Sequence, residues 1–269
     1  YLWGGDPAYW KRHAPVLFPI VGKVYGNTYR AEGQEYELPQ HGFARDMDFR
    51  MVSHSDTEAS FRLTASEETL RKYPYSFELS VVYRLISNRV QVQWTVKNCD
   101  TRTLYYQIGG HPAFLLRDYV ASDAVHGYML FESMADEEEF EALDHLRTNL
   151  LGPSGCCLNQ YRDIPLEEGL LPLTDDTFAH DALVLEDSQA ECVTLMDKEK
   201  RPYLRLTSYD ATVMGLWAPH ITGCPFACIE PWMGRADREG FDLDITRREH
   251  IFACLPGEKE SFAYEIEIL

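Results

Sequence analysis

Two short segments of the sequence place a titratable side chain beside proline at the end of a strand-like run. The first is Gly-Gly-His-Pro-Ala-Phe, in which two glycines permit the close approach of a ligand and the proline holds His111 extended. An imidazole with a pKa of about 6.5 suits proton transfer near neutral pH. His111 is therefore a candidate acid or base, and the alternative is a histidine that merely satisfies a polar position in the core.

The second segment is Ile-Glu-Pro-Trp, which directly follows the apolar run at residues 226–229. We expect partial burial of Glu230 at the end of this strand, which raises a carboxyl pKa and makes the carboxylate a better base. The alternative is a strand-end glutamate that forms an ion pair with Arg235 or Arg238. If both candidates react, we expect His111 and Glu230 to flank one pocket across a gap the width of a sugar.

Two further segments could bind a substrate. The turn Pro-Gln-His-Gly-Phe-Ala-Arg carries His41 and Arg45, although a histidine on a turn is usually just solvated. Leu-Trp-Ala-Pro-His carries Trp217, and Trp232 lies two residues after the glutamate of the second segment. Indole faces suit the apolar C–H faces of sugars, so both tryptophans could form a stacking wall, while core packing is the commoner use of tryptophan.

Chemistry that needs a metal or another cofactor has little support in the sequence. Cys224 and Cys228 lack a second pair at zinc-ligand spacing, and the oxygen-rich run at residues 237–244 does not fit an EF-hand loop. Neither a glycine-rich nucleotide-binding pattern nor a Gly-x-Ser-x-Gly nucleophile is found. Acid–base catalysis by histidine and glutamate, with no metal and no cofactor, is the chemistry that remains.

Composition narrows the choice of partners. The 269 residues include 25 Lys and Arg against 43 Asp and Glu, a net charge of −18, which disfavours nucleic acid and anionic membrane surfaces. The seven cysteines are odd in number and fit buried thiols in a reducing compartment. With no apolar run of membrane-spanning length and no secretory leader, we expect a cytoplasmic protein.

β strands must position these side chains, because alternating apolar and polar residues dominate the chain. Residues 89–98 alternate cleanly, residues 77–86 precede them through a tight hairpin, and the C-terminal residues 262–268 repeat the pattern. Further strands are predicted at residues 61–64, 104–108, 182–185, 192–196, 203–208, 212–217 and 226–229. Residues 66–72 could form a short helix, and the acidic residues 134–146 either a helix or a solvated loop. The sequence thus predicts an all-β protein, a large antiparallel β-sandwich that forms a single domain over residues 1–269.

The segments, in their order along the chain, resemble the aldose 1-epimerase (galactose mutarotase-like) superfamily, and most closely its LacX-like bacterial branch. The opening block, Leu-Trp-Gly-Gly-Asp-Pro at residues 2–7 followed by Trp10, also fits and implies that a short N-terminal strand segment precedes Tyr1. The matching blocks are Pro-Ile-Val-Gly-Lys-Val at residues 19–24, Leu-Pro-Gln-His-Gly-Phe-Ala-Arg at 38–45, Gly-Gly-His-Pro-Ala-Phe at 109–114 and Cys-Ile-Glu-Pro-Trp at 228–232.

The resemblance implies a concave sugar-binding cleft on one sheet and an isomerase that interconverts the anomers of a free hexose. By matched position, His111 is the general acid and Glu230 the general base, and His41 donates a hydrogen bond to the sugar near its ring oxygen. Asp181 matches a substrate-binding aspartate, with the adjacent His180 as a competing match. Trp217 falls where the family has an aromatic wall.

Lys23 departs from the family pattern. Well-studied galactose enzymes carry an arginine there, and lysine cannot form arginine's bidentate fork, so Arg45 could take over the sugar contact. Lys23 and Arg45 together could instead bind a phosphate group, as in hexose-6-phosphate mutarotases. A non-catalytic carbohydrate-binding module is the other alternative. In each case the partner is a small sugar, and the chain is expected to be a monomer or a homodimer.

Overall fold

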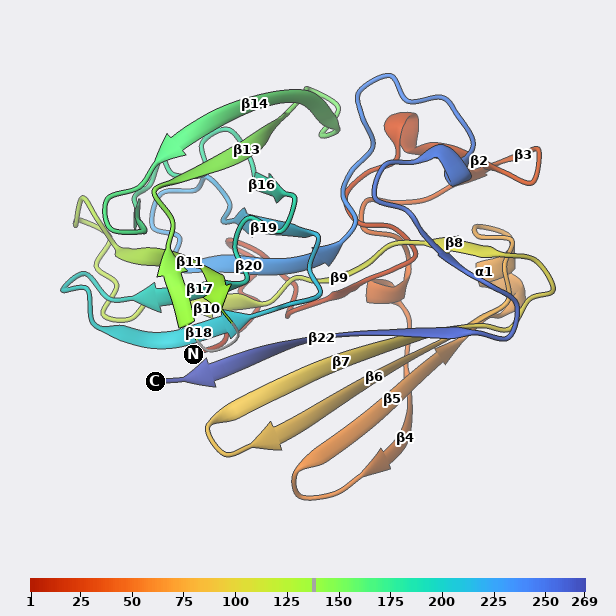
Figure 1. Ribbon diagram of the computed structural model, residues 1–269, viewed down its shortest axis with the longest axis horizontal. Coiled ribbons are helices and arrows are strands. Elements are labelled where there is room, and N and C mark those ends of the chain that lie inside the picture. Colours follow the sequence, from red (N-terminus) through yellow and green to blue (C-terminus); the bar gives the residue numbers. More distant parts are fainter. Residues whose placement is uncertain (137–138) are drawn as a thin grey trace.

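Two large antiparallel β-sheets form most of the molecule (Figure 1). The computed structural model describes residues 1–136 and 139–269. Across the first sheet the strands follow the order β1 (Val16–Leu17), β9 (Ile108–Gly110), β20 (Phe226–Met233), β19 (Val213–Trp217), β16 (Leu183–Glu186), β13 (His145–Leu151) and β14 (Cys157–Pro165), and β10 (Ala113–Leu115) also pairs with β20.

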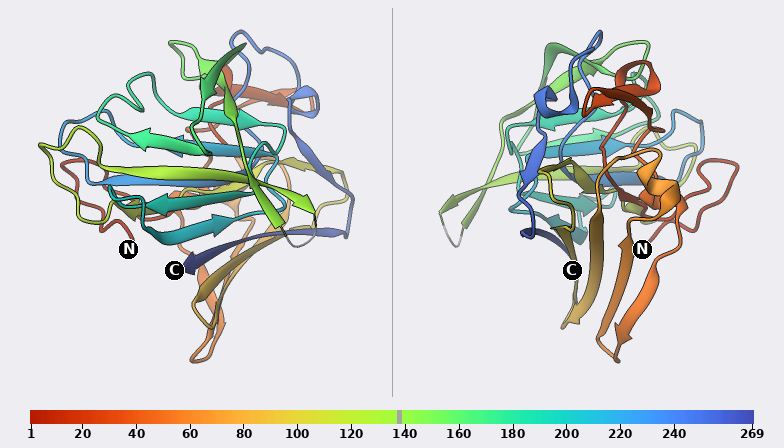
Figure 2. Two further views of the ribbon diagram at one scale, coloured as in Figure 1. Left: turned by 60° about the vertical axis from the view of Figure 1, so that its left-hand side comes forward. Right: turned by 90° about the vertical axis from the view of Figure 1, so that its right-hand side faces the viewer.

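In the part of the chain that the structure describes, the second sheet has ten strands against eight in the first, and its strands β4 to β7 project beyond the rest of the molecule (Figure 2). Its order is β12 (Glu139–Ala142), β11 (Gly127–Asp136), β17 (Cys192–Met196), β18 (Pro202–Thr207), β22 (Lys259–Ile268), β7 (Arg89–Asn98), β6 (Phe77–Ile86), β5 (Glu58–Thr64) and β4 (Arg50–His54), and β15 (Leu170–Leu173) pairs with β11.

Smaller elements complete the described chain. They are the hairpin of β2 (Thr28–Ala31) and β3 (Gln34–Glu37), the pair of β8 (Leu104–Tyr106) and β21 (Phe252–Cys254), helix α1 (Glu67–Leu70), and the 3-10 turns at Tyr25–Asn27, Ala44–Asp46 and Ile245–Arg247. Within the described residues, no helix is long and apolar enough to cross a membrane.

The main core lies between the two sheets. In β7 the side chains of Val92, Trp94 and Val96 are buried, as the alternation predicts, and Trp94 stands opposite Val81 of β6 and Phe262 of β22. Because successive residues of a strand face opposite sides, each central strand packs one set of side chains into this core. The predicted all-β sandwich is confirmed.

Of the two segments predicted as possible helices, one is helical and the other contributes to strands. The predicted short helix is present as α1, where Ser66 and Thr69 form a capping box. The acidic segment at residues 134–146 is not helical where it is described, because it contributes to β11, β12 and β13, while Glu137 and Glu138 lie outside the described residues.

The opposite face of the first sheet carries the polar segments. Register aligns Glu230 on β20 with Gly215 on β19, Val184 on β16 and Asn149 on β13, so these four positions form a row across the sheet. Neighbouring strands lie about 4.8 Å apart. The row therefore spans about 14 Å, which is long enough to form the floor of a cavity for a small molecule.

Candidate active site

The strand that precedes His111 is broken at the histidine. β9 and β10 both pair with β20, but His111 and Pro112 between them leave the ladder, apart from a hydrogen bond from the Ile229 amide to the Pro112 carbonyl (3.2 Å). The His111 side chain consequently stands over the middle of β20. The pairing of β9 and β10 with the distant strand β20 thus orients the His111 side chain, and the local Gly-Gly-His-Pro sequence permits the interruption between β9 and β10.

Glu230 lies within β20 and not at its end. The predicted strand stopped at Ile229, but β20 continues to Met233. Amides two residues apart point to the same side of a strand, so the nitrogen of Pro231, like that of Ile229, faces the gap between β9 and β10. The missing N–H of Pro231 therefore removes no ladder hydrogen bond, and the strand can continue through the proline.

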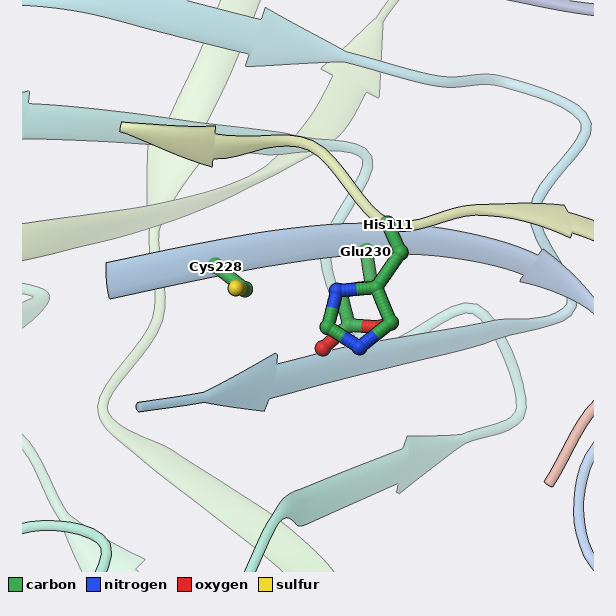
Figure 3. A group of neighbouring side chains, drawn as sticks. All are labelled: His111, Cys228 and Glu230. Atoms are coloured by element: carbon green, nitrogen blue, oxygen red, sulfur yellow. The ribbon is translucent and has the colours of Figure 1, made fainter. Parts of the chain in front are cut away.

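His111 and Glu230 are in direct contact. The Nε2 atom of His111 lies 3.2 Å from Oε2 of Glu230, and the two residues are only 7% and 1% exposed (Figure 3). The expected sugar-wide gap between them is wrong, although both line the same cavity. Glu230 also does not pair with Arg235, which instead binds Glu186 and Glu249.

Burial disfavours the charged form of both groups. Desolvation, followed by the positive charge of Arg45, lowers the pKa of His111 to about 3. Desolvation also raises the pKa of Glu230 well above its usual value, with the Trp232 indole acting in the opposite direction and Asp181 adding to the rise. Burial therefore favours a neutral imidazole at His111 beside a protonated carboxyl group at Glu230.

One cavity of about 350 Å³ brings together all eight residues that were predicted as catalytic or substrate-binding. Such a volume lies at the small end of the range for ligand pockets, about 300–1,000 Å³. Asp181 lines it, whereas His180 lines an adjoining cavity of about 360 Å³ and not this one. The predicted residues on its wall are Lys23, His41, Arg45, His111, Asp181, Trp217, Glu230 and Trp232.

His41 is held as a neutral hydrogen-bond donor. The Gly22 amide donates to its Nδ1 atom (3.1 Å), which leaves the hydrogen on Nε2. Burial, followed by the charges of His111 and Arg45, lowers the pKa of His41 well below its ordinary value. Its backbone has φ +64°, and the adjacent Gly42 has φ +69° at a point where a Cβ would collide with a carbonyl oxygen. His41 is therefore buried and held in place by the turn, and the alternative of a merely solvated histidine is wrong.

The two cations of the cavity have different partners. Lys23 donates to the carbonyl of Ser154 (3.1 Å), and Arg45 faces Asp46 at 3.8 Å. Burial lowers the pKa of Arg45 to about 10, so it stays charged at neutral pH. Its Nε atom is buried and unpaired. Arg45 can therefore offer a hydrogen bond to a ligand, whereas Lys23 is already engaged.

Three tryptophans form the walls. The Trp232 indole lies over Gly215, where any Cβ would collide with the ring. Trp217 meets the His111 ring edge-on at 5.7 Å. Trp10 stacks on His111 with ring centroids 4.6 Å apart and lines the same cavity. Trp10 was missed as a site residue; its only signal was its place in the opening block that matches the family.

Buried polar atoms without a partner gather in this cavity. Among the described residues they include Nδ1 of His111, Oε2 of Glu230, Nε1 of Trp232 and Nε of Arg45. Buried polar groups are normally hydrogen-bonded, so such a cluster indicates a site built for a polar ligand.

A buried ion pair between Arg248 and Asp237 supports the backbone at the edge of the cavity. This pair was not predicted from the sequence. Arg248 lies 2.8 Å from Asp237 and donates to the carbonyls of Val21 (3.1 Å) and Lys23 (3.3 Å). These carbonyls flank Gly22, whose amide orients His41. Arg248 thereby supports the histidine through the backbone.

A metal ion could be held in one place within the described residues. Ligand atoms of His111, Cys228 and Glu230 all lie within 4.8 Å of one another. The three come from distant or alternating positions, so spacing along the sequence did not reveal them. The expectation that the protein needs no metal stays a prediction.

Comparisons with known proteins identify the family and its fold. The family model described as aldose 1-epimerase matches residues 1–238. The chromosomal LacX protein of Lactococcus lactis subsp. lactis is 30% identical, over 100% of this chain and 89% of its own length. A galactose mutarotase-like protein from Lactobacillus casei superposes with a TM-score of 0.90 at 30% identity, over 100% of this chain and 89% of that one. A galactose mutarotase related enzyme from Lactobacillus acidophilus gives 0.88 at 30% identity, over 100% and 86%.

Proposed function

The chain belongs to the aldose 1-epimerase family, and on this premise we propose that it is an isomerase that interconverts the α and β anomers of a free hexose. The observation that carries the proposal is the 3.2 Å contact between His111 and Glu230 in a polar cavity. Mutarotation needs one proton donor and one proton acceptor, and this pair supplies both.

The reaction has three steps. A base takes the proton of the anomeric hydroxyl while an acid protonates the ring oxygen, and the C1–O5 bond breaks to give the open aldehyde. The C1–C2 bond then rotates. The O5 hydroxyl attacks the other face of the aldehyde, and the two protein groups exchange roles as the ring closes.

Contact between acid and base suits this chemistry. The anomeric hydroxyl oxygen and the ring oxygen are bonded to the same carbon, so both partners must act on neighbouring atoms. In the proposal, Glu230 is the base at the hydroxyl and His111 the acid at the ring oxygen. The carboxyl proton of the free protein first passes to His111 across 3.2 Å, which creates the required imidazolium and carboxylate.

Other side chains orient the sugar in this proposal. The Nε2–H of His41 donates to a sugar oxygen near the ring oxygen, and Arg45 and Asp181 bind hydroxyls at the rim of the cavity. The indoles of Trp217 and Trp232 contact the C–H faces of the ring. These contacts fix the sugar against the acid–base pair and exclude water from it.

Polarimetry of freshly dissolved α-anomers tests the proposal. Each acid–base group typically contributes about 10²–10⁴-fold to the rate, so His111→Asn and Glu230→Gln should each lose at least about 100-fold in turnover. His126→Asn is a matched control, because His126 is a buried histidine that does not line the cavity. Wild-type rates in both site variants would remove these residues from the chemistry.

A phosphorylated hexose is a second candidate substrate. Arg45 also lines a neighbouring cavity of about 350 Å³ together with Lys11 and Arg12, although Arg12 already binds the Asp46 carboxylate at 2.7 Å. Such a set of cations favours a phosphate substituent. A comparison of hexoses with their 6-phosphates distinguishes the two, because a phosphate-specific enzyme would lose its preference in Arg45→Ala.

A further inference from the structure

Cys228 lies beside the acid–base pair but outside its proton chemistry. Cys228 and Glu230 are two residues apart on β20, so they occupy the same face of the strand, and His111 reaches Glu230 from the break between β9 and β10, with Cys228 to one side (Figure 3). The three residues are 0%, 1% and 7% exposed, and their ligand atoms lie within 4.8 Å of one another.

These three side chains have unused binding capacity. Nδ1 of His111 is buried without a hydrogen-bond partner, Oε2 of Glu230 contacts Nε2 of His111 at 3.2 Å without forming a hydrogen bond, and Cys228 is a free cysteine. One nitrogen, one sulfur and one carboxylate oxygen form a ligand set that Zn²⁺ prefers, at bond lengths of about 2.0–2.3 Å and with a fourth position open to water or substrate. Small side-chain movements would bring the three atoms to these distances.

Charge balance also favours a divalent ion. Zn²⁺ binds cysteine as a thiolate, glutamate as a carboxylate and histidine as a neutral imidazole, and the protons that these groups release pass to solvent. The thiolate and the carboxylate then offset the two positive charges, and the imidazole remains neutral. The occupied site therefore carries no net charge, which a buried position requires.

We propose that His111, Cys228 and Glu230 form a reversible Zn²⁺ site whose occupation blocks the acid–base pair. The ion reaches the site through the cavity that His111 and Glu230 line. Once bound, it occupies the Glu230 lone pair that would accept the proton, and its positive charge opposes protonation of His111 at Nε2. The blocking effect rests on the proposed mutarotase function, whereas zinc binding does not.

The first experiment follows mutarotation during titration with Zn²⁺. Zn²⁺ should inhibit, Mg²⁺ should not because it prefers oxygen ligands, and EDTA should restore the rate. Cys228→Ser should keep the basal rate and require at least about 100-fold more Zn²⁺, since loss of a ligand exceeds the 10–100-fold effect typical of a supporting residue. Cys254→Ser, another buried thiol far along the chain, should remain as sensitive as the wild type. Equal inhibition of both variants, or activation by Zn²⁺, would overturn the proposal.

The second experiment needs neither activity nor the serine variant. Co²⁺ added to the wild type should give the near-ultraviolet charge-transfer absorption of a cobalt–thiolate bond, and Zn²⁺ should remove it. His111→Asn and Glu230→Gln should each weaken Co²⁺ binding at least about 10-fold. If the absorption appears while no sugar is turned over, only the proposed function fails. If it is absent, the metal site is refuted.

Discussion

Folding should move one proton from His111 to Glu230, and the pH dependence of stability can reveal this transfer. In the unfolded chain, between pH 4.5 and 6.5, the histidine is protonated and the glutamate is ionised, as their ordinary values dictate. In the folded protein the pKa of His111 falls to about 3 and that of Glu230 rises. The pair binds one proton in either state, so it adds no pH dependence to the wild type in this window.

Single substitutions expose the two opposing contributions. In Glu230→Gln, the remaining histidine binds a proton in this pH range only in the unfolded chain. The free energy of unfolding should therefore increase by about 2 kcal/mol as pH rises from 4.5 to 6.5. In His111→Asn, the raised pKa of Glu230 lets the carboxyl keep its proton in the folded state after the unfolded chain has lost it, so stability falls as pH rises over the same range.

Urea denaturation at several pH values, followed by tryptophan fluorescence, measures these differences. The rest of the chain contributes equally to all three proteins, so the free energy of unfolding of each variant is compared with that of the wild type at the same pH. The two differences should change in opposite directions. If both variants run parallel to the wild type, burial shifts the pKa of neither remaining group, and the reasoning from burial is refuted.

Three more predictions follow from the site. The acid limb of the pH profile of kcat/KM should have a pKa well below 6.5, the usual pKa of histidine, because activity is lost only when pH falls through the lowered pKa of His111. An acid limb with a pKa near 6.5 would contradict this prediction. Gly42→Ala should destabilise the fold by at least about 2 kcal/mol in denaturation experiments, because its φ is +69° and a Cβ would collide with the Phe18 carbonyl. Arg248→Met should cost about 3–5 kcal/mol by leaving Asp237 buried without its partner, and Asp237→Asn in the same chain should recover part of the loss.

The strands and the site residues were largely predictable, because each has a local signal. Alternation in residues 89–98 marks β7 directly, and glycine or proline beside His41, His111 and Glu230 marks places where the backbone departs from regular pairing. All these side chains lie on one cavity wall. Their chemical roles remain predictions.

Other features depend on contacts between distant segments. The contact between His111 and Glu230 arises because β9 and β10 both pair with β20, which no local pattern encodes. Trp10 becomes a wall of the site only when the N-terminal segment packs on His111. Likewise, Arg248 looks like an ordinary charged residue until three backbone carbonyls surround it.

A double-mutant cycle in the anomer-exchange assay tests the central claim most directly, namely that His111 and Glu230 act as one proton-sharing unit. Rates are measured for the wild type, His111→Asn, Glu230→Gln and the double variant on the same hexose. Residues that act as a unit give non-additive losses, so the double variant should be about as slow as the slower single variant. A wild-type rate in either single variant, or losses that multiply in the double variant, would contradict the account.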